Sequence, residues 1–181
     1  MTTFESGLQV FGGDIVYASD YAALVASLPK TYRKDLATPR SSTITLDEDP
    51  ELDGIPLGVG AYDIELIAYF TVANTTPKLK TRWGFTGTIT NTLRLCHGPG
   101  ANNVGGPEAV SDATMRAYAL SSQDAIYNTS TSSAYSAISE IAYGVEVTVA
   151  GNLSLLWAQS VSNASAVTVR EDSAFRVRKI R

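Results

Sequence analysis

Cysteine, histidine and long hydrophobic runs are scarce in this sequence. Its 181 residues include one cysteine, Cys96, and one histidine, His97, so no internal disulfide can form. No apolar run approaches the ~20 residues that a membrane-spanning helix needs. Residues 1–11 lack the basic start and apolar middle of a secretory signal. We therefore expect a protein with no membrane partner, made in a reducing cytoplasm.

Catalytic motifs are also missing. Cys96 and His97 are adjacent, and neighbouring residues of a strand point to opposite faces, so they cannot act together as nucleophile and base. The sequence has no glycine-rich phosphate loop, no zinc-ligand spacing and no serine motif with a histidine in reach. These observations predict a protein that is not an enzyme and that binds no cofactor.

Positive charge is concentrated at one end of the chain. The formal net charge is −4, while residues 170–181 hold five cations and two anions, so that segment carries +3 and the remainder −7. A nucleic-acid binder needs a broad basic face with interleaved aromatic side chains, so we expect no nucleic-acid partner. The basic end is either a docking surface or a solvated strand face that carries Arg176 and Arg178.

What the chain does contain favours strands. Hydrophobic residues make up 44% and charged residues 18%, and 14 glycines and 7 prolines interrupt the sequence. With its many Thr, Ser, Val and Tyr residues, this composition is typical of β-structure. The predicted fold class is all-β, an antiparallel two-sheet sandwich of about eight strands. We place the sandwich at residues 39–181 and an N-terminal attachment extension at 1–38.

Alternating apolar residues locate the expected strands. The longest is 61–73, and shorter ones are expected at 41–46, 79–85, 88–97 and 114–120. Residues 134–143 fit either a helical or a strand spacing, and we assign a strand; residues 123–131 fit a short helix or an irregular loop. Three further strands follow Val145-Val149, joined by hairpin turns at Gly151-Asn152 and Glu171-Asp172-Ser173.

One short amphipathic helix is expected in the N-terminal extension. Ser19 suits a helix N-cap, and Pro29 ends the run. Four apolar residues between them follow helical spacing: Tyr21, Leu24, Val25 and Leu28. This stripe either packs against the sandwich or meets the same stripe of two other copies around an axis.

The densest group of carboxylates lies at residues 47–53. Asp49, Glu51 and Asp53, followed by Gly54, copy part of the spacing of an EF-hand calcium loop. The rest of that pattern fails, because Gly60 stands where the bidentate Glu should be and Pro50 stiffens the loop. We therefore interpret the segment as an exposed acidic loop and keep the three carboxylates as candidate metal ligands.

Several apolar or aromatic residues are expected to face outward. Ile67 and Tyr69 lie on the second face of strand 61–73, and Leu156 lies on the second face of a later strand whose main face carries Trp157. A large apolar residue on an outward face suits a contact with another subunit. The residues that we consider for stacking on or contacting a glycan are His97, Tyr118 and Tyr127.

The last third of the chain carries a resemblance to a known family. The segments are Leu155-Leu156-Trp157-Ala158-Gln159-Ser160-Val161-Ser162-Asn163-Ala164-Ser165, Val167-Thr168-Val169-Arg170, Ser173 and Phe175-Arg176-Val177-Arg178-Lys179-Ile180. They resemble the C-terminal end of small jelly-roll virion proteins, usually labelled minor tail proteins, of tailed phages that infect actinobacteria. The chain departs from that pattern at Ser160 and at Glu171-Asp172, where the family has Asn and a small residue followed by Gly.

The resemblance implies a jelly roll and a place in a phage particle. It leads us to expect a homotrimeric, non-enzymatic virion protein in the minor tail, with contact to a host cell-wall glycan. The alternatives are a decoration protein that ties capsid subunits together and a free carbohydrate-binding module. The expected partners are further copies of the chain and other virion proteins of the tail or capsid.

Overall fold

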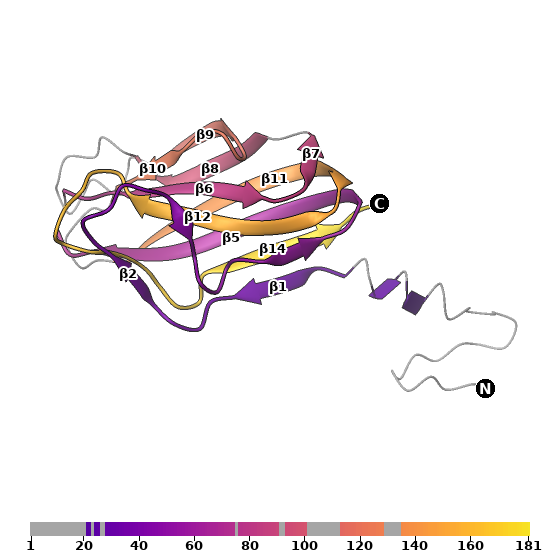
Figure 1. The fold of residues 1–181 in the computed structure, drawn as a ribbon, viewed down its shortest axis with the longest axis horizontal. Coiled ribbons are helices and arrows are strands. Elements are labelled where there is room, and N and C mark those ends of the chain that lie inside the picture. Colours follow the sequence, from indigo (N-terminus) through magenta and orange to yellow (C-terminus); the bar gives the residue numbers. More distant parts are fainter. Residues whose placement is uncertain are drawn as a thin grey trace, which may run out of the picture.

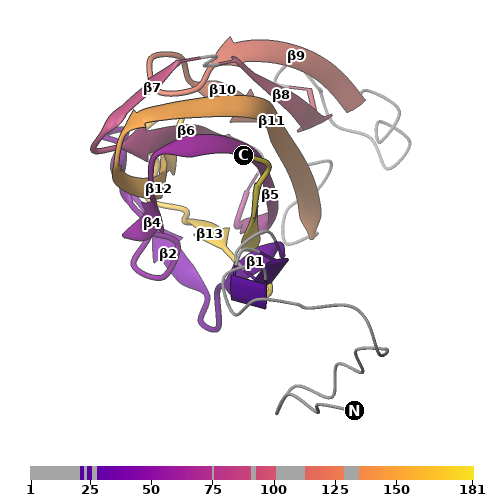
Figure 2. The same cartoon turned by 90° about the vertical axis from the view of Figure 1, so that its right-hand side faces the viewer.

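A computed structural model describes residues 21–22, 24–25, 28–74, 76–90, 93–100, 113–128 and 135–181. Strands account for 61% and helices for 3%, which confirms the all-β class. Two antiparallel sheets face each other (Figures 1 and 2). Residues 1–20, which make up much of the expected attachment extension, lie outside the described part of the chain.

The larger sheet has the order β1-β14-β5-β11-β8-β9; in addition β13 pairs with β5 and with β2, and β7 pairs with β11. Its long central strands are β5 and β11, and β1 and β9 are its edges. The bounds are β1 (Lys30–Arg33), β2 (Thr38–Arg40), β5 (Gly60–Val72), β7 (Thr88–Thr90), β8 (Leu93–Pro99), β9 (Ala113–Ala119), β11 (Ser136–Val149), β13 (Val167–Val169) and β14 (Ala174–Lys179).

The smaller sheet has the order β10-β6-β12-β3, with β4 also paired to β12. Its strands are β3 (Asp47–Glu48), β4 (Ile55–Leu57), β6 (Leu79–Phe85), β10 (Ala125–Tyr127) and β12 (Gly151–Gln159). The core lies between the two sheets. Trp83 of the smaller sheet meets Phe175 of the larger one edge to face, with ring centroids 5.1 Å apart, and both residues are fully buried.

Alternation predicts the long strands well. In β5, the six even-numbered residues from Tyr62 to Val72 are buried, while Ile67 and Tyr69 are exposed. Residues 136–149 form a single strand, β11, so the strand assignment for 134–143 is confirmed for its described part. The strand expected at 88–97 is instead two strands, β7 and β8, and residues 91–92 between them lie outside the described part.

The turn expected at residues 171–173 does not reverse the chain. β13 and β14 both pair antiparallel with β5, β13 at Phe70–Val72 and β14 at residues 62–67, so the two strands continue in one direction along the same partner. Between them the backbone bulges, with Asp172 at a φ of 68°. The buried Ser173 hydroxyl fixes the bulge: it donates to the carbonyl of Arg170 (2.8 Å) and accepts from the amide of Tyr69 (3.0 Å).

The hairpin expected at Gly151-Asn152 is also wrong, because the chain changes sheets there. β11 belongs to the larger sheet and β12 to the smaller one, and the single residue Ala150 separates them. Gly151 passes so close to Gly87 that a Cβ on Gly151 would lie 2.2 Å from the Gly87 nitrogen. The glycine is therefore required by a close approach of two backbones.

Residues 41–46 connect the two sheets along one side of the sandwich and do not form the expected strand. β2 lies in the larger sheet and β3 in the smaller, so residues 41–46 cross between the sheets, and Ile44 is exposed. Arg40 holds the crossing in place. Its guanidinium donates to the carbonyl of Asp47 (2.7 Å) and stacks over the Trp157 ring, 4.2 Å from the centroid.

Two more segments differ from expectation. Residues 125–127 form strand β10, so the helix or loop expected at 123–131 is wrong for that part. Lys30–Arg33, within the expected extension, pairs with β14 as an edge of the larger sheet. A complete helix over 21–28 is not shown: residues 21, 22, 24 and 25 are helical, and residues 23, 26 and 27 lie outside the described part.

Candidate interaction surface

The outer face of the larger sheet is assembled from side chains that the strand registers bring into rows. One row crosses five strands in the order Ala174, Ile67, Ser139, His97 and Met115. The next row is Arg176, Glu65, Ile141, Leu95 and Ala117. The first row holds no Asp, Glu, Lys or Arg, while the second runs from charged residues near β14 to apolar residues near β9, so the charged groups of these two rows lie on the β14 side of the face.

In the half formed by β11, β8 and β9, the only charged outward residue among those described is Glu146, which lies beyond the bulge of β11 and pairs with Arg181. The large members of this half are exposed, with relative exposures of 68% for Met115, 65% for Leu93 and 42% for Leu95. Towards β5 the same half continues through Ile67 (38%) and Tyr69 (36%). We call this region the apolar half, defined by Ile67, Tyr69, Leu93, Leu95, His97, Met115, Ala117 and Ile141.

The area of the apolar half can be estimated from sheet geometry. Three interstrand steps of ~4.8 Å separate β5 from β9, and the seven residues of β9 at ~3.3 Å each span ~23 Å. The product is about 330 Å² in projection. Monomeric soluble proteins rarely leave apolar patches larger than a few hundred Å² uncovered. A patch of this size is comparable with the largest apolar patch of a typical monomer, which is often functional, so the apolar half is a candidate contact surface.

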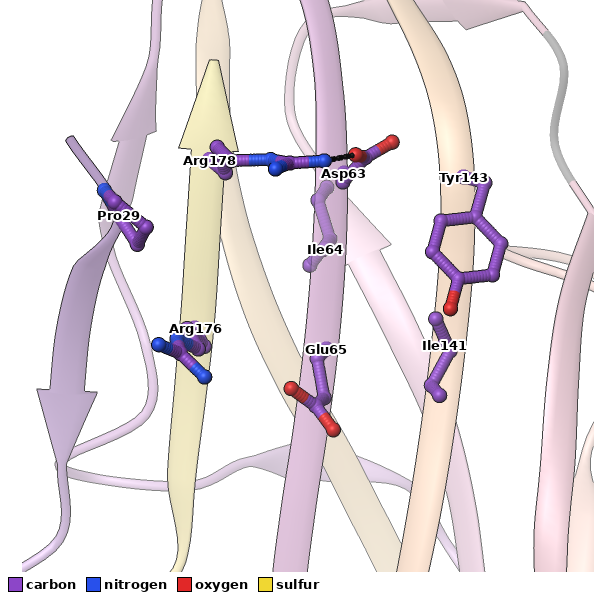
Figure 3. Close-up of a pocket in the computed structure, with 8 residues that line it drawn as sticks. All are labelled: Pro29, Asp63, Ile64, Glu65, Ile141, Tyr143, Arg176 and Arg178. Carbon is purple, nitrogen blue, oxygen red and sulfur yellow. Dashed lines mark hydrogen bonds and ion pairs between the residues drawn. The ribbon is translucent and has the colours of Figure 1, made fainter. Parts of the chain in front are cut away.

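The charged half surrounds a shallow cavity of about 280 Å³ (Figure 3). On one side Arg178 donates to the Asp63 carboxylate at 2.5 Å, and the Gly144 amide donates to the same carboxylate at 3.1 Å. The hydrogen bond from Arg178 is the main reason that the pKa of Asp63 lies below its usual value. On the other side, Glu65 and Arg176 line the cavity from neighbouring strands.

Tyr143 extends the cavity towards the apolar half. It follows the register shift of β11 between Ala142 and Val145, where Gly144 takes a φ of 61°. This bulge directs Tyr143 outward, with 64% of the residue exposed, and Figure 3 shows its ring beside Ile141. Tyr135, 66% exposed, lies at the other end of β11 under the Arg170 guanidinium, 5.2 Å from the ring centroid.

The structure brings together three of the residues that the sequence singled out for contacts. Ile67 and His97 lie in one row of the larger sheet, and Tyr69 lies beside them on the same face. Leu156 lies on the outward side of β12 in the other sheet, where it is half-buried against Gly84, so it belongs to a different surface. Tyr21 is half-buried and Leu24, Val25 and Leu28 are exposed, but none of them lies in the apolar half.

Two of the three expected glycan contacts are not on an open surface. Tyr127 is 4% exposed and donates to Glu140 (2.8 Å), so its ring is part of the core and cannot stack on a sugar. Tyr118 is half-buried and packs against the core. His97 is exposed on the outer face of the larger sheet. The sequence does not single out the exposed pair Tyr135, directly before β11, and Tyr143, at the bulge of β11.

The candidate metal ligands at residues 49–53 have other partners. Asp49 is fully buried and accepts from the Lys34 ammonium (2.9 Å) and the Trp157 indole (3.0 Å), so the expected exposed loop is wrong at this residue. Glu51 also accepts from Lys34, at 3.1 Å. Asp53 accepts from Ser154. Within the described ranges no group of three or more His, Cys, Asp or Glu residues is placed to hold a metal ion.

Hydrogen bonds from the chain backbone also reach the Glu51 carboxylate. The amide of Leu36 donates at 3.0 Å and that of Asp35 at 3.3 Å. The Leu36 amide is the largest cause of the lowered pKa of Glu51, followed by its bonding to Lys34. The three carboxylates therefore attach residues 49–53 to residues 34–36 and to β12 and are used in the fold.

A buried ionic cluster that the sequence did not indicate lies between the sheets. Arg94 of β8 and Glu140 of β11 are both fully buried and pair at 2.5 Å. Glu140 also accepts from Thr81 of β6 (2.5 Å) and Tyr127 of β10 (2.8 Å), so the cluster links the two sheets. Burial, together with the nearby Glu140 charge, raises the pKa of the adjacent Cys96 thiol to about 11.

None of the helical residues in the described part forms a segment that is long and apolar enough to cross a membrane. No known protein-family model matches this sequence, and no curated protein matches it.

Proposed function

We propose that this chain is a non-enzymatic structural protein of a tailed-phage particle, displayed as a trimeric jelly roll in the minor tail, where it contacts the host surface. The observation that carries the proposal is the apolar half of the outer sheet face. This half has no charged member and exposes Leu93, Leu95 and Met115. An exposed apolar surface of this kind marks a site of contact with another protein.

The residues that carry the resemblance support the proposal through their structural roles. The Gln159 side chain donates to the Ser165 carbonyl (2.6 Å) and accepts from the Asn163 amide (3.0 Å), and Asn163 accepts from the Ser165 amide (2.8 Å). These bonds fix the loop between β12 and β13. Trp157 is fully buried. The motif therefore specifies a loop and a core position, which a shared fold would require.

Contact with a host glycan is supported by exposed rings and polar groups on the same face. Tyr143 lies beside the cavity that Glu65 and Arg176 line, and His97 lies on the adjoining apolar half. An apolar ring face stacks on a sugar ring, while charged and polar groups bind its hydroxyls. A protein at the tail tip would use this arrangement for attachment.

Capsid decoration is the alternative location. An exposed apolar sheet face is suited to lie against major capsid subunits, and the apolar half has this character. A free carbohydrate-binding module would need the Tyr143 cavity alone and no self-association. The three alternatives therefore differ in what covers the apolar half.

Two measurements test the proposal. Sedimentation equilibrium of the purified chain at micromolar concentration should give a trimer. A low-resolution image of particles that carry a label on this chain should then show density at the tail. Density across the shell would favour decoration. A monomer that binds cell-wall glycan in solution would favour the free module, and absence of the chain from particles would refute the proposal.

A further inference from the structure

The main strand order of the larger sheet ends in two edge strands of opposite character, β1 and β9. β1 carries Lys30 and Arg33 at its ends, both exposed, and charged side chains on an edge discourage the pairing of another strand. At the other edge, β9 pairs on one side with β8, and no second strand among the described residues pairs with it. The outward residues Met115, Ala117 and Ala119 of β9 are all uncharged.

Hydrogen bonding shows which backbone groups of β9 are free to pair. Ala119 donates its N–H to the Gln123 side chain (2.8 Å), so this N–H points away from β8. In an antiparallel ladder, alternate residues direct their N–H and C=O groups to the same side. Met115 and Ala117 therefore present both groups at the free edge. Gln123 caps the Ala119 end, and residues 113–117 have no second strand partner within the described part of the chain.

The N-terminal sequence contains a segment with the pattern that this edge needs. From Phe4 onward, Phe4, Leu8 and Val10 would lie on one face of a strand and Glu5 and Gln9 on the other. The apolar face would continue the apolar half beyond β9. The opposite face of β9 carries the exposed Arg116, which is complementary in charge to Glu5.

The N-terminal segment is long enough to reach a neighbouring copy. The described chain enters the sheet at β1, and five interstrand steps of ~4.8 Å separate β1 from β9, a path of about 24 Å along the sheet. Figure 2 shows the two strands far apart on the curved sheet. When copies stand side by side, the β1 edge of one copy comes next to the β9 edge of the next. The twenty residues before Tyr21 span up to about 66 Å when extended, which is enough for this exchange.

Area supports the same conclusion. A stable interface buries ~800 Å² on each partner. The apolar half provides about 330 Å² of projected area, from the interstrand spacing and the length of β9. Contact through this face alone would therefore be too small, and an added strand supplies both further area and backbone hydrogen bonds.

We infer that the free edge of β9 at residues 113–117 binds residues 3–10 of a neighbouring copy as an added strand, with Phe4, Leu8 and Val10 extending the apolar half and Glu5 facing Arg116. This inference rests on the self-association in the proposed function. Because donor and acceptor lie at opposite edges of the sheet, the contact is heterologous and can close into a ring of three.

Proline substitution in the full-length chain tests the acceptor edge. The variant Ala117→Pro removes an N–H that points away from β8, and proline is tolerated at such edge positions. Thr31→Pro is the matched control at the β1 edge. Lys34 donates its N–H to the Ser173 carbonyl, so by alternation the Thr31 N–H points away from β14. In sedimentation equilibrium, Ala117→Pro should weaken association at least tenfold, and Thr31→Pro should not.

Two substitutions in the donor segment provide an independent test. Leu8→Asp should weaken association at least tenfold, while Gln9→Asp, on the opposite face of the expected strand, should leave it within about threefold. In the wild-type assembly the Met115 amide should be protected from hydrogen exchange, and Leu8→Asp should remove this protection. Should Ala117→Pro fail to fold by circular dichroism, Leu8→Asp still decides.

A trimer that persists in both Ala117→Pro and Leu8→Asp would overturn the inference and leave the proposed function intact. A monomeric wild-type chain would overturn the inference together with the trimer in the proposed function.

Discussion

Removing the Glu140 charge should destabilise the fold more than any change to a surface ion pair. Glu140 and Arg94 are fully buried and pair at 2.5 Å, so Glu140→Gln leaves the guanidinium buried without a counterion. Breaking a buried ion pair from one side costs about 3–5 kcal/mol. For a chain of this length, that loss corresponds to a decrease of about 6–20 °C in the midpoint of thermal unfolding.

Urea unfolding, monitored by tryptophan fluorescence, measures the effect as a change in the free energy of unfolding. The control is Asp172→Asn, because the Arg33–Asp172 pair is exposed (62% and 57%) and should contribute less than about 0.5 kcal/mol. Asparagine also tolerates the positive φ at this position.

A double-mutant cycle identifies the origin of the loss. Arg94→Met alone should also cost about 3–5 kcal/mol, while Arg94→Met combined with Glu140→Gln should cost at least ~2 kcal/mol less than the sum of the two. Single losses below about 1 kcal/mol, or strict additivity, would refute the assignment of Arg94 and Glu140 as a coupled pair that links β8 and β11.

Three further predictions concern the backbone and the charged half. Ser173→Ala should cost about 1–2 kcal/mol in urea unfolding, because the bulge between β13 and β14 loses buried hydrogen bonds; an unchanged midpoint would contradict this. Gly151→Ala should cost about 3 kcal/mol, since its Cβ would lie 2.2 Å from Gly87, whereas Gly54→Ala, with open space around it, should cost less; equal losses would count against a close approach of the two backbones. The pKa of Asp63 is lowered in the fold, so its contribution to stability is present above the unfolded value of ~3.9 and disappears as pH falls through the folded pKa. In Asp63→Asn, the free energy of unfolding should therefore fall less steeply below about pH 4 than in the wild type. The same pH dependence in both proteins would show that the Arg178 contact does not contribute to stability.

The sequence predicts the long strands because their period is set by burial on one face. In β5 the alternation of buried and exposed side chains extends from Tyr62 to Val72 and places Ile67 and Tyr69 outward, as expected. β6 and β9 are also close to the predicted ranges. For these elements, side-chain polarity records which face meets the core, and no partner needs to be known.

The missed features depend on partners that are far away in the sequence. Ser173 was interpreted as part of a reversing turn, but pairing of β13 and β14 with the same edge of β5 turns the segment into a bulge. Gly151 suited a hairpin, and only its approach to Gly87 shows that it marks a change of sheet. The residues of these two segments suit a reversing turn as well as a bulge or a change of sheet, so local turn chemistry alone could not decide between these structures.

Buried charges were the least predictable part of the candidate site. Asp49 lies in a run of acidic residues that is typical of solvated loops, and its burial depends on Lys34, fifteen residues earlier, and Trp157 in the other half of the chain. Tyr127 was expected at the surface because its segment is polar, and the Glu140 carboxylate instead accounts for its place in the core. The polarity of a segment alone does not show whether its polar side chains have a buried partner elsewhere in the chain.

The central claim is that copies of this chain assemble through the apolar half of the outer sheet face together with the adjoining edge of β9. Sedimentation equilibrium of Leu95→Glu tests it most directly, with Ile126→Glu as the control, because Ile126 is exposed on the outward side of β10 in the other sheet. The account predicts a monomer for Leu95→Glu and a trimer for Ile126→Glu at the same micromolar concentration. A trimer for Leu95→Glu, with its fold intact by circular dichroism, would contradict it.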